Sequence, residues 1–197
     1  MGSGHKYVRV TRGSNNFHVS AVTFTLSYSS GGSSYSITYN CDGGTVCPST
    51  VASATTLPNP LPSGLTKSGY AFAGWFTDAD KTVAAVAGAS IAANTTLYAK
   101  WTPTYTVTYN GNGNTGGTAP SDASSPYTAG SNVTVLGNTG SLVKTGYTFD
   151  GWNTADDGSG TNYAVGATIS SIAANTTLYA KWVEDSCTDP GLTITLN

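Results

Sequence analysis

Charged side chains are scarce in this sequence. Only 9% of its 197 residues are Asp, Glu, Lys or Arg, whereas about 25% is usual for soluble domains. Both arginines, Arg9 and Arg12, lie near the N-terminus, and the formal net charge is −2. Nucleic-acid binding needs a basic surface that neutralises phosphates. The composition therefore argues against a nucleic-acid partner.

Most of the side chains that perform acid–base chemistry are also missing. The histidines are His5 and His18 and the only glutamate is Glu184, so residues 35–182 contain neither type. The densest carboxylates are two pairs in predicted turns, Asp78 with Asp80 and Asp156 with Asp157. Carboxylates in turns usually bind nearby backbone N–H groups. The sequence thus predicts no enzyme, no catalytic residue, no metal site and no cofactor.

No apolar run is long enough to cross a bilayer, so no membrane span is expected. Cysteine is rare as well, with three residues in the chain. Cys41 and Cys47 flank a short glycine-containing loop and would form a disulfide in an oxidising compartment. The alternative is two free thiols. Cys187 is left over, either free or available to cross-link another chain.

An internal repeat sets the organisation of the chain. Eleven residues, 91–101, recur unchanged as residues 172–182. Upstream, Gly-Tyr-Ala-Phe-Ala-Gly-Trp at 69–75 matches Gly-Tyr-Thr-Phe-Asp-Gly-Trp at 146–152, and residues 35–40 match residues 105–110. The same order of landmarks predicts module 1 at 35–101 and module 2 at 105–182. Residues 102–104 would be a short linker that contains Pro103 and leaves little freedom.

Each landmark has the alternating pattern of a β-strand. Ile37 and Tyr39 alternate with hydroxyl side chains, as do Val107 and Tyr109. The segments between the landmarks are rich in Gly, Asn and Asp, which is typical of turns. The fold class is therefore predicted to be mostly β, with two small modules in tandem.

Four tryptophans occupy equivalent positions in the two copies: Trp75 and Trp101, Trp152 and Trp182. Small modules with few large apolar residues need such side chains in the core. Core packing is the favoured interpretation. The alternative, stacking on sugar rings, would make the chain a carbohydrate-binding module.

The ends of the chain, residues 1–34 and 183–197, lie outside both modules and carry their own strand patterns. Their apolar residues alternate with Thr and Ser, and an unpaired strand has to find a partner. The candidates for assembly are therefore Val22, Phe24, Leu26, Tyr28, Cys187, Leu192, Ile194 and Leu196. Such strands pair with each other, extend the module sheets, or insert into another subunit.

The signature Gly-Tyr-Thr-Phe-Asp-Gly-Trp followed by Asn-Thr-Thr-Leu-Tyr-Ala-Lys-Trp resembles the Listeria–Bacteroides repeat, the B-repeat type of internalins. The resemblance covers both modules. It implies compact β-grasp-like modules in tandem on the bacterial cell surface, without catalysis, as stalk, spacer or adhesive elements. The partner would be a cell-surface or host protein, a glycan, or the chain itself. The alternative is an extracellular filament subunit whose terminal strands join neighbouring copies.

Overall fold

The computed structural model describes residues 33–186, and the chain in this range folds into strands and loops without a helix. This confirms the prediction of a mostly β protein. All eight assembly candidates, from Val22 to Leu196, lie outside the described residues. The strands are β1 (Tyr35–Asn40), β2 (Val51–Ala54), β3 (Tyr70–Phe76), β4 (Thr95–Tyr105), β5 (Val107–Asn110), β6 (Tyr127–Thr128), β7 (Val133–Thr134), β8 (Tyr147–Asn153), β9 (Asn162–Tyr163), β10 (Thr168–Ile169) and β11 (Thr176–Glu184).

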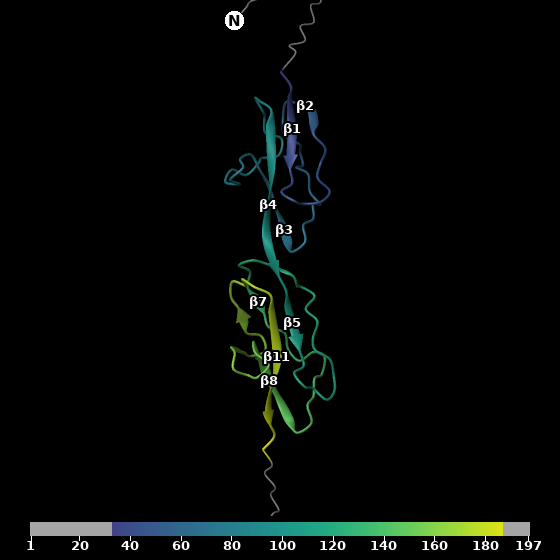
Figure 1. Cartoon of the computed structure of the whole chain (residues 1–197), viewed down its shortest axis with the longest axis vertical. Helices are drawn as coiled ribbons and strands as arrows, with labels where there is room; N and C mark the ends of the chain where they lie inside the picture. Colours follow the sequence, from purple (N-terminus) through teal and green to yellow (C-terminus); the bar gives the residue numbers. More distant parts are fainter. Residues whose placement is uncertain (1–32, 187–197) are drawn as a thin grey trace, which may run out of the picture. The chain divides into compact units, whose positions relative to one another are not determined.

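The sheet of module 1 has the strand order β2-β1-β4-β3. Its first and last strands, β1 and β4, run parallel and place Ile37 opposite Thr95. β3 pairs antiparallel with the other side of β4, and β2 pairs antiparallel with the outer side of β1. Figure 1 shows β1 and β4 side by side.

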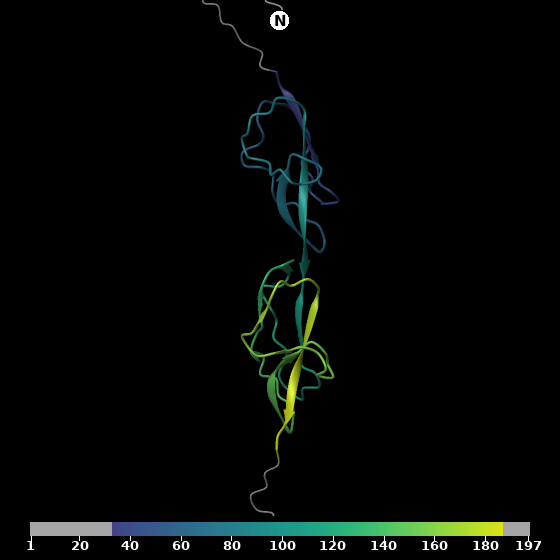
Figure 2. The same cartoon turned by 90° about the vertical axis from the view of Figure 1, so that its left-hand side faces the viewer.

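Module 2 repeats this arrangement around β11. β5 runs parallel to β11 with Val107 opposite Thr176, and β8 pairs antiparallel with the other side of β11. The sheet order is β5-β11-β8-β9, and β7 and β10 form a separate two-stranded ribbon. The view in Figure 2, turned by 90°, shows the long β4 and β11 as the central strands of their modules.

The alternation of side chains explains why these segments are strands. In β4, Leu97 and Ala99 are fully buried, while Tyr98 between them is partly exposed. Leu178 and Ala180 occupy the same places in β11. Successive residues of a strand point to opposite faces of the sheet, so each module buries one face of its central strand.

The two modules have separate cores. The core of module 1 contains Ile37, Trp75 and Leu97, and the core of module 2 contains Val107, Trp152 and Leu178. No residue belongs to both cores. Each module therefore has the apolar interior of a small domain of its own.

The predicted linker, residues 102–104, belongs to β4. Pairing with β3 continues to Pro103, which lies opposite Tyr70, and the N–H of Thr104 donates to the carbonyl of Gly69 at 2.8 Å. The end of β4 then pairs with β6 of module 2, with Tyr105 opposite Tyr127. One strand thus closes the sheet of module 1 and leads directly to β5.

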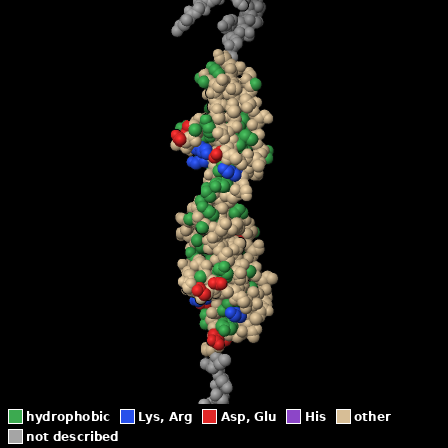
Figure 3. All heavy atoms as spheres, viewed as in Figure 1, with side chains coloured by type: hydrophobic (Ala, Val, Ile, Leu, Met, Phe, Trp, Pro, Cys, Tyr) green, Lys and Arg blue, Asp and Glu red, His purple; other side chains and the backbone are tan. Residues whose placement is uncertain are grey.

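The surface is mostly neutral, as the composition requires. Figure 3 shows charged side chains in a few small groups among hydroxyl, amide and backbone atoms. Two ion pairs occur in residues 33–186, Lys81 with Asp42 at 2.6 Å and Lys181 with Asp150 at 2.8 Å.

Candidate functional site

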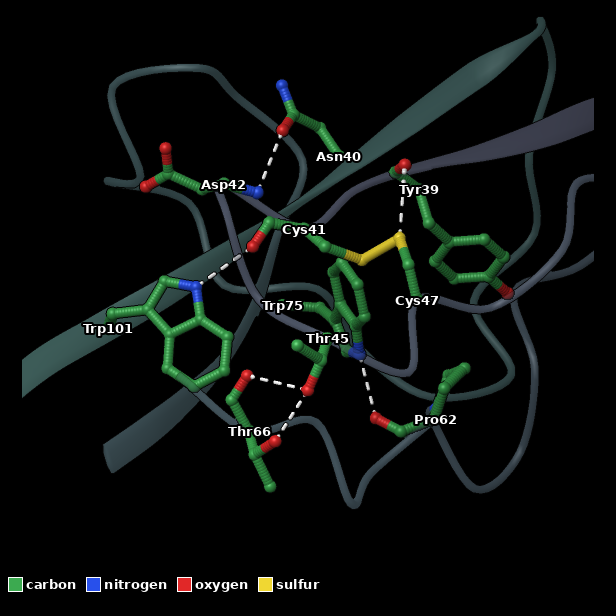
Figure 4. Close-up of a disulfide and its surroundings, with 10 residues drawn as sticks. All are labelled: Tyr39, Asn40, Cys41, Asp42, Thr45, Cys47, Pro62, Thr66, Trp75 and Trp101. Atoms are coloured by element: carbon green, nitrogen blue, oxygen red, sulfur yellow. Dashed lines mark hydrogen bonds between the residues drawn. A yellow bond between two sulfur atoms is a disulfide. The ribbon is translucent and has the colours of Figure 1, made fainter. Parts of the chain in front are cut away.

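The structure brings Cys41 and Cys47 together, as the predicted disulfide requires. Cys41 and Cys47 form a disulfide that closes the loop following β1 (Figure 4). The carbonyl of Cys41 accepts the indole N–H of Trp101 at 3.0 Å. A Cβ atom at Gly44 would overlap the ring of Trp101, so glycine at this place lets the loop pack closely on the aromatic side chain.

This loop leads the chain back along the outer edge of β1. The Sγ atom of Cys47 lies 3.8 Å from the carbonyl oxygen of Tyr39. Beyond the loop, β2 pairs with the same edge, with Val51 opposite Ile37 and Ala54 opposite Tyr35. The disulfide loop and β2 therefore cover the outer edge of the first strand in module 1.

The equivalent edge in module 2 is covered only at its start. There β6 pairs with Tyr105, the counterpart of Tyr35, but it does not continue along β5, which is the terminal strand of its sheet. The N–H of Thr176 donates to the carbonyl of Thr106 at 2.9 Å. In a parallel ladder, the backbone N–H and C=O groups of alternate residues point to the neighbouring strand. The backbone groups of Thr106, Thr108 and Asn110 therefore point to β11, and those of Val107 and Tyr109 point to the outer edge, although both side chains pack in the core.

Among the described residues, one side-chain hydrogen bond reaches the backbone groups on the outer edge of β5. The N–H of Val107 donates to Ser125 Oγ at 3.3 Å. No hydrogen bond from another described residue reaches the carbonyl of Val107 or the backbone groups of Tyr109. A hollow of about 420 Å³ runs along the edge, lined by Thr106, Val107, Thr108, Tyr109, Ala119, Pro120, Ser121, Asp122 and Ser125. Unpaired strand edges are the places where another strand adds to a sheet.

The four tryptophans belong to two matching rows of aromatic rings. In module 1, Trp75 lies edge-on to Tyr39 and Phe72, and Phe72 lies edge-on to Trp101. The corresponding row in module 2 is Tyr109, Trp152, Phe149 and Trp182.

Trp75 and Trp152 are buried, which confirms core packing for these two. Trp101 and Trp182 are partly buried against the same cores. Each donates its indole N–H to the backbone, Trp182 to the carbonyl of Gly111 at 3.1 Å. Burial raises the pKa of the Tyr39 hydroxyl in one row and of the Tyr109 hydroxyl in the other.

One aspartate of each predicted pair is held in a turn by hydrogen bonds. Asp78 accepts the backbone N–H groups of Thr82 and Val83, and these bonds lower the pKa of its carboxyl. Asp157 accepts the hydroxyl and N–H of Ser159, which lowers its pKa in the same way. Both carboxylates hold turns together, as the sequence predicts for this residue type. Among residues 33–186 no group of three His, Cys, Asp or Glu side chains could hold a metal ion.

Asn153, whose side chain holds a turn of module 2 in place, was not identified from the sequence. Asn153 is buried at the end of β8, where its Nδ2 lies within hydrogen-bonding distance of the Gly158 and Gly160 carbonyls. Its Oδ1 accepts the N–H groups of Ala155 and Gly160. The equivalent residue of module 1 is Phe76, as the pairing of Tyr98 with Phe76 and of Tyr179 with Asn153 shows. Comparison of the two copies at this position was the signal that could have identified it.

Within residues 33–186, no helix has the length and hydrophobicity needed to cross a membrane. Two proteins of Evansella cellulosilytica are similar to this chain. One, provisionally named a membrane protein, is 36% identical over 77% of the chain, and the other, provisionally named a Gly-rich membrane protein, is 37% identical over 60%. The chain spans only 23% and 14% of their lengths. No solved structure matches it.

The family comparison agrees with the repeat found in the sequence. The Listeria-Bacteroides repeat domain matches residues 35–100 and again residues 105–181. These ranges coincide with the two sheets and their separate cores. The chain therefore belongs to the Listeria-Bacteroides repeat family, with two tandem copies of its domain.

Proposed function

We propose that this chain is a non-enzymatic spacer on a bacterial cell surface, in which two modules separate the segments at their ends. The observation that carries the proposal is the continuity of β4. This strand closes the sheet of module 1, and its last two residues pair with β6 of module 2. A spacer has to keep its modules in a fixed arrangement, and a strand that pairs with both modules restricts their relative motion more than a flexible linker does.

Hydrogen bonds on both sides of the junction support this role. The N–H of Thr104 binds the carbonyl of Gly69 in module 1, and the carbonyl of Pro103 accepts the N–H of Ala129 in module 2 at 2.8 Å. Tyr105, the last residue of β4, packs against the core of module 2. Proline in a strand lacks the N–H for a ladder, and here the carbonyl of Pro103 provides the link.

An extracellular location is part of the proposal. The Cys41–Cys47 disulfide supports it, because such bonds persist in oxidising compartments and are rare in the cytosol. The provisional names of the two relatives as membrane proteins point the same way. Thiol alkylation and mass spectrometry of the protein isolated from its cells should find these two cysteines oxidised in the surface fraction.

Pulsed electron paramagnetic resonance tests the spacer role. Spin labels at Val83→Cys and Val165→Cys, both on exposed side chains of different modules, should give a narrow distance distribution in a Cys187→Ser background. Insertion of Gly-Ser-Gly-Ser after Thr102 should broaden it, whereas the same insertion after Ser63, in an exposed loop of module 1, should not. A broad distribution in the uninterrupted chain would contradict the proposal.

A further inference from the structure

The first strands of the two modules differ at their outer edges. β1 is covered by β2 and by the Cys41–Cys47 loop, whereas β5 faces a hollow. We propose that the outer edge of β5 binds residues 192–196 of a second copy of this chain as an added strand. The resulting contact joins the tail of one copy to module 2 of the next. It goes beyond the spacer role, which a monomer fulfils equally well.

The backbone of β5 offers the hydrogen bonds that an added strand requires. The carbonyl of Val107 and the N–H and carbonyl of Tyr109 point to the outer edge of β5. The hydrogen bond from Thr176 to Thr106 fixes this orientation, because backbone groups of successive residues point to opposite sides of the strand. A β-strand uses such alternate groups to pair with its neighbour. In module 1 the corresponding edge pairs with a strand of its own chain, Ile37 with Val51. In module 2 the corresponding segment contacts this edge only through Ser125, whose Oγ accepts the N–H of Val107.

The side chains of residues 192–196 suit this edge. The segment Leu-Thr-Ile-Thr-Leu has apolar residues at alternate positions, hydroxyls between them and no charge. β5 has the same two-faced pattern, with Val107 on the core side and Thr108 on the outer side, where Thr108 and Thr177 share a hydroxyl contact at 3.1 Å. An added strand with Ile194 on the core side would place its aliphatic residues toward Ala119 and Pro120, which line the hollow. Its threonines would continue the row of hydroxyls.

The length of the tail favours a second copy over the same molecule. β11 continues past Tyr179, the partner of Asn110, to Glu184, and Asp185 is still bonded to Gly146. The tail therefore starts about 17 Å beyond the end of β5 at about 3.3 Å per residue. Residues 186–191 reach at most about 20 Å when fully extended. The difference of about 3 Å is shorter than one residue and does not allow the reversal and sideways step that docking on the same molecule requires.

Sedimentation velocity over a concentration series tests the inference, with Cys187→Ser as the parent so that no thiol cross-link contributes. We expect the parent to form oligomers whose mass grows with concentration. Ile194→Asp, which places a charge on the core side of the added strand, should give monomers at all concentrations. Thr193→Asp places the same charge on the opposite side and should associate like the parent.

A second pair of variants tests the outer edge of β5, where the added strand is proposed to bind. Ala119 lines the hollow, whereas Ala123 lies in the same segment but does not line it. Ala119→Arg should abolish association and Ala123→Arg should leave it intact, with unchanged far-ultraviolet circular dichroism for both.

Three results would overturn the inference. The first is a parent protein that stays monomeric at all concentrations. That result is expected if residues 192–197 act as the first strand of a repeat, because Leu-Thr-Ile-Thr-Leu-Asn matches Tyr-Thr-Val-Thr-Tyr-Asn at 105–110. Oligomers that persist in Ala119→Arg would place the contact elsewhere. A monomer in which Ile194→Asp increases amide exchange of β5 would show that the tail docks on its own molecule.

Discussion

Asn153 illustrates what one side chain does in a module with few charged groups. Its amide bonds hold the turn that follows β8, where five backbone or side-chain groups of residues 155–162 converge on it. Module 1 has Phe76 at this position, and the ammonium group of Lys100 lies 4.8 Å from the centre of its ring. The same place in the fold is thus stabilised by hydrogen bonds in one copy and by a cation–π contact in the other.

Removing the Asn153 amide should destabilise module 2 strongly. Asn153→Ala removes several partly buried hydrogen bonds to N–H and carbonyl groups of the turn, and each such bond contributes about 0.5–1.5 kcal/mol. We expect a loss of about 2–4 kcal/mol in urea unfolding. Asn162→Ala, which removes one partner from an exposed residue, should cost less than about 1 kcal/mol. Equal losses for the two variants would show that the turn does not depend on Asn153.

The Asp78 carboxylate should contribute to the acid sensitivity of module 1. Its hydrogen bonds from Thr82 and Val83 hold its pKa below the ordinary value of 3.8. Since the pKa is lower in the folded state than in the unfolded state, the carboxylate stabilises the fold above the unfolded pKa. This stabilisation is lost as the pH falls through the folded pKa.

Asp78→Asn should therefore flatten the decline of the melting temperature below about pH 4. Thermal unfolding followed by circular dichroism between about pH 6 and about pH 2 measures this slope. The control is Asp80→Asn, an exposed carboxylate of the same turn for which no hydrogen bond to another described residue is found. This substitution should leave the slope as it is in the parent. An unchanged slope in Asp78→Asn would contradict the assignment.

At the scale of elements, the main strands could be predicted from the sequence, whereas β2 and β6 could not. The repeated landmarks at 35–40 and 69–75 correspond to β1 and β3, and the second part of the landmark at 91–101 belongs to β4. Alternation of apolar and hydroxyl residues depends only on local geometry. β2 and β6 carry no such pattern, and their pairing depends on where the preceding loop returns the chain. The extension of β4 through Pro103 was missed because proline normally interrupts a ladder.

The difference between the two outer edges was equally hidden from the sequence. Cys41 and Cys47 were predicted as a disulfide in an oxidising compartment, but their role in bringing residues 47–54 back to β1 requires the pairing of Val51 with Ile37. Edge exposure depends on tertiary contacts, so two copies with the same signature differ in what they leave unpaired.

Loss of the disulfide should expose the outer edge of β1. The Cys41→Ala/Cys47→Ser double variant removes a short covalent loop, which corresponds to about 2 kcal/mol of stability for a loop of this size. We expect faster amide hydrogen exchange in β1 and β2, at Val51 above all, and unchanged exchange in β5 and β11. Slow exchange retained at Val51 would show that β2 pairs with β1 without the covalent loop.

At the scale of the whole molecule, two separate cores are joined by one strand. Tandem modules of this kind have their own stabilities plus an interface contribution between neighbours. Here the interface consists of the end of β4, its pairing with β6 and the Pro103–Ala129 hydrogen bond. These contacts are few compared with the cores, so the junction should orient the modules without making their unfolding a single event.

Leu97→Ala and Leu178→Ala test this division. Both leucines are fully buried at equivalent places in β4 and β11, and truncation of such a residue costs about 2–5 kcal/mol. Native-state hydrogen exchange should show Leu97→Ala increasing exchange in β1, β3 and β4 while β8 and β11 keep their protection. Leu178→Ala should give the reverse pattern. If either variant destabilised both sheets equally, the modules would form one cooperative unit, and the stability of each copy would depend on its neighbour.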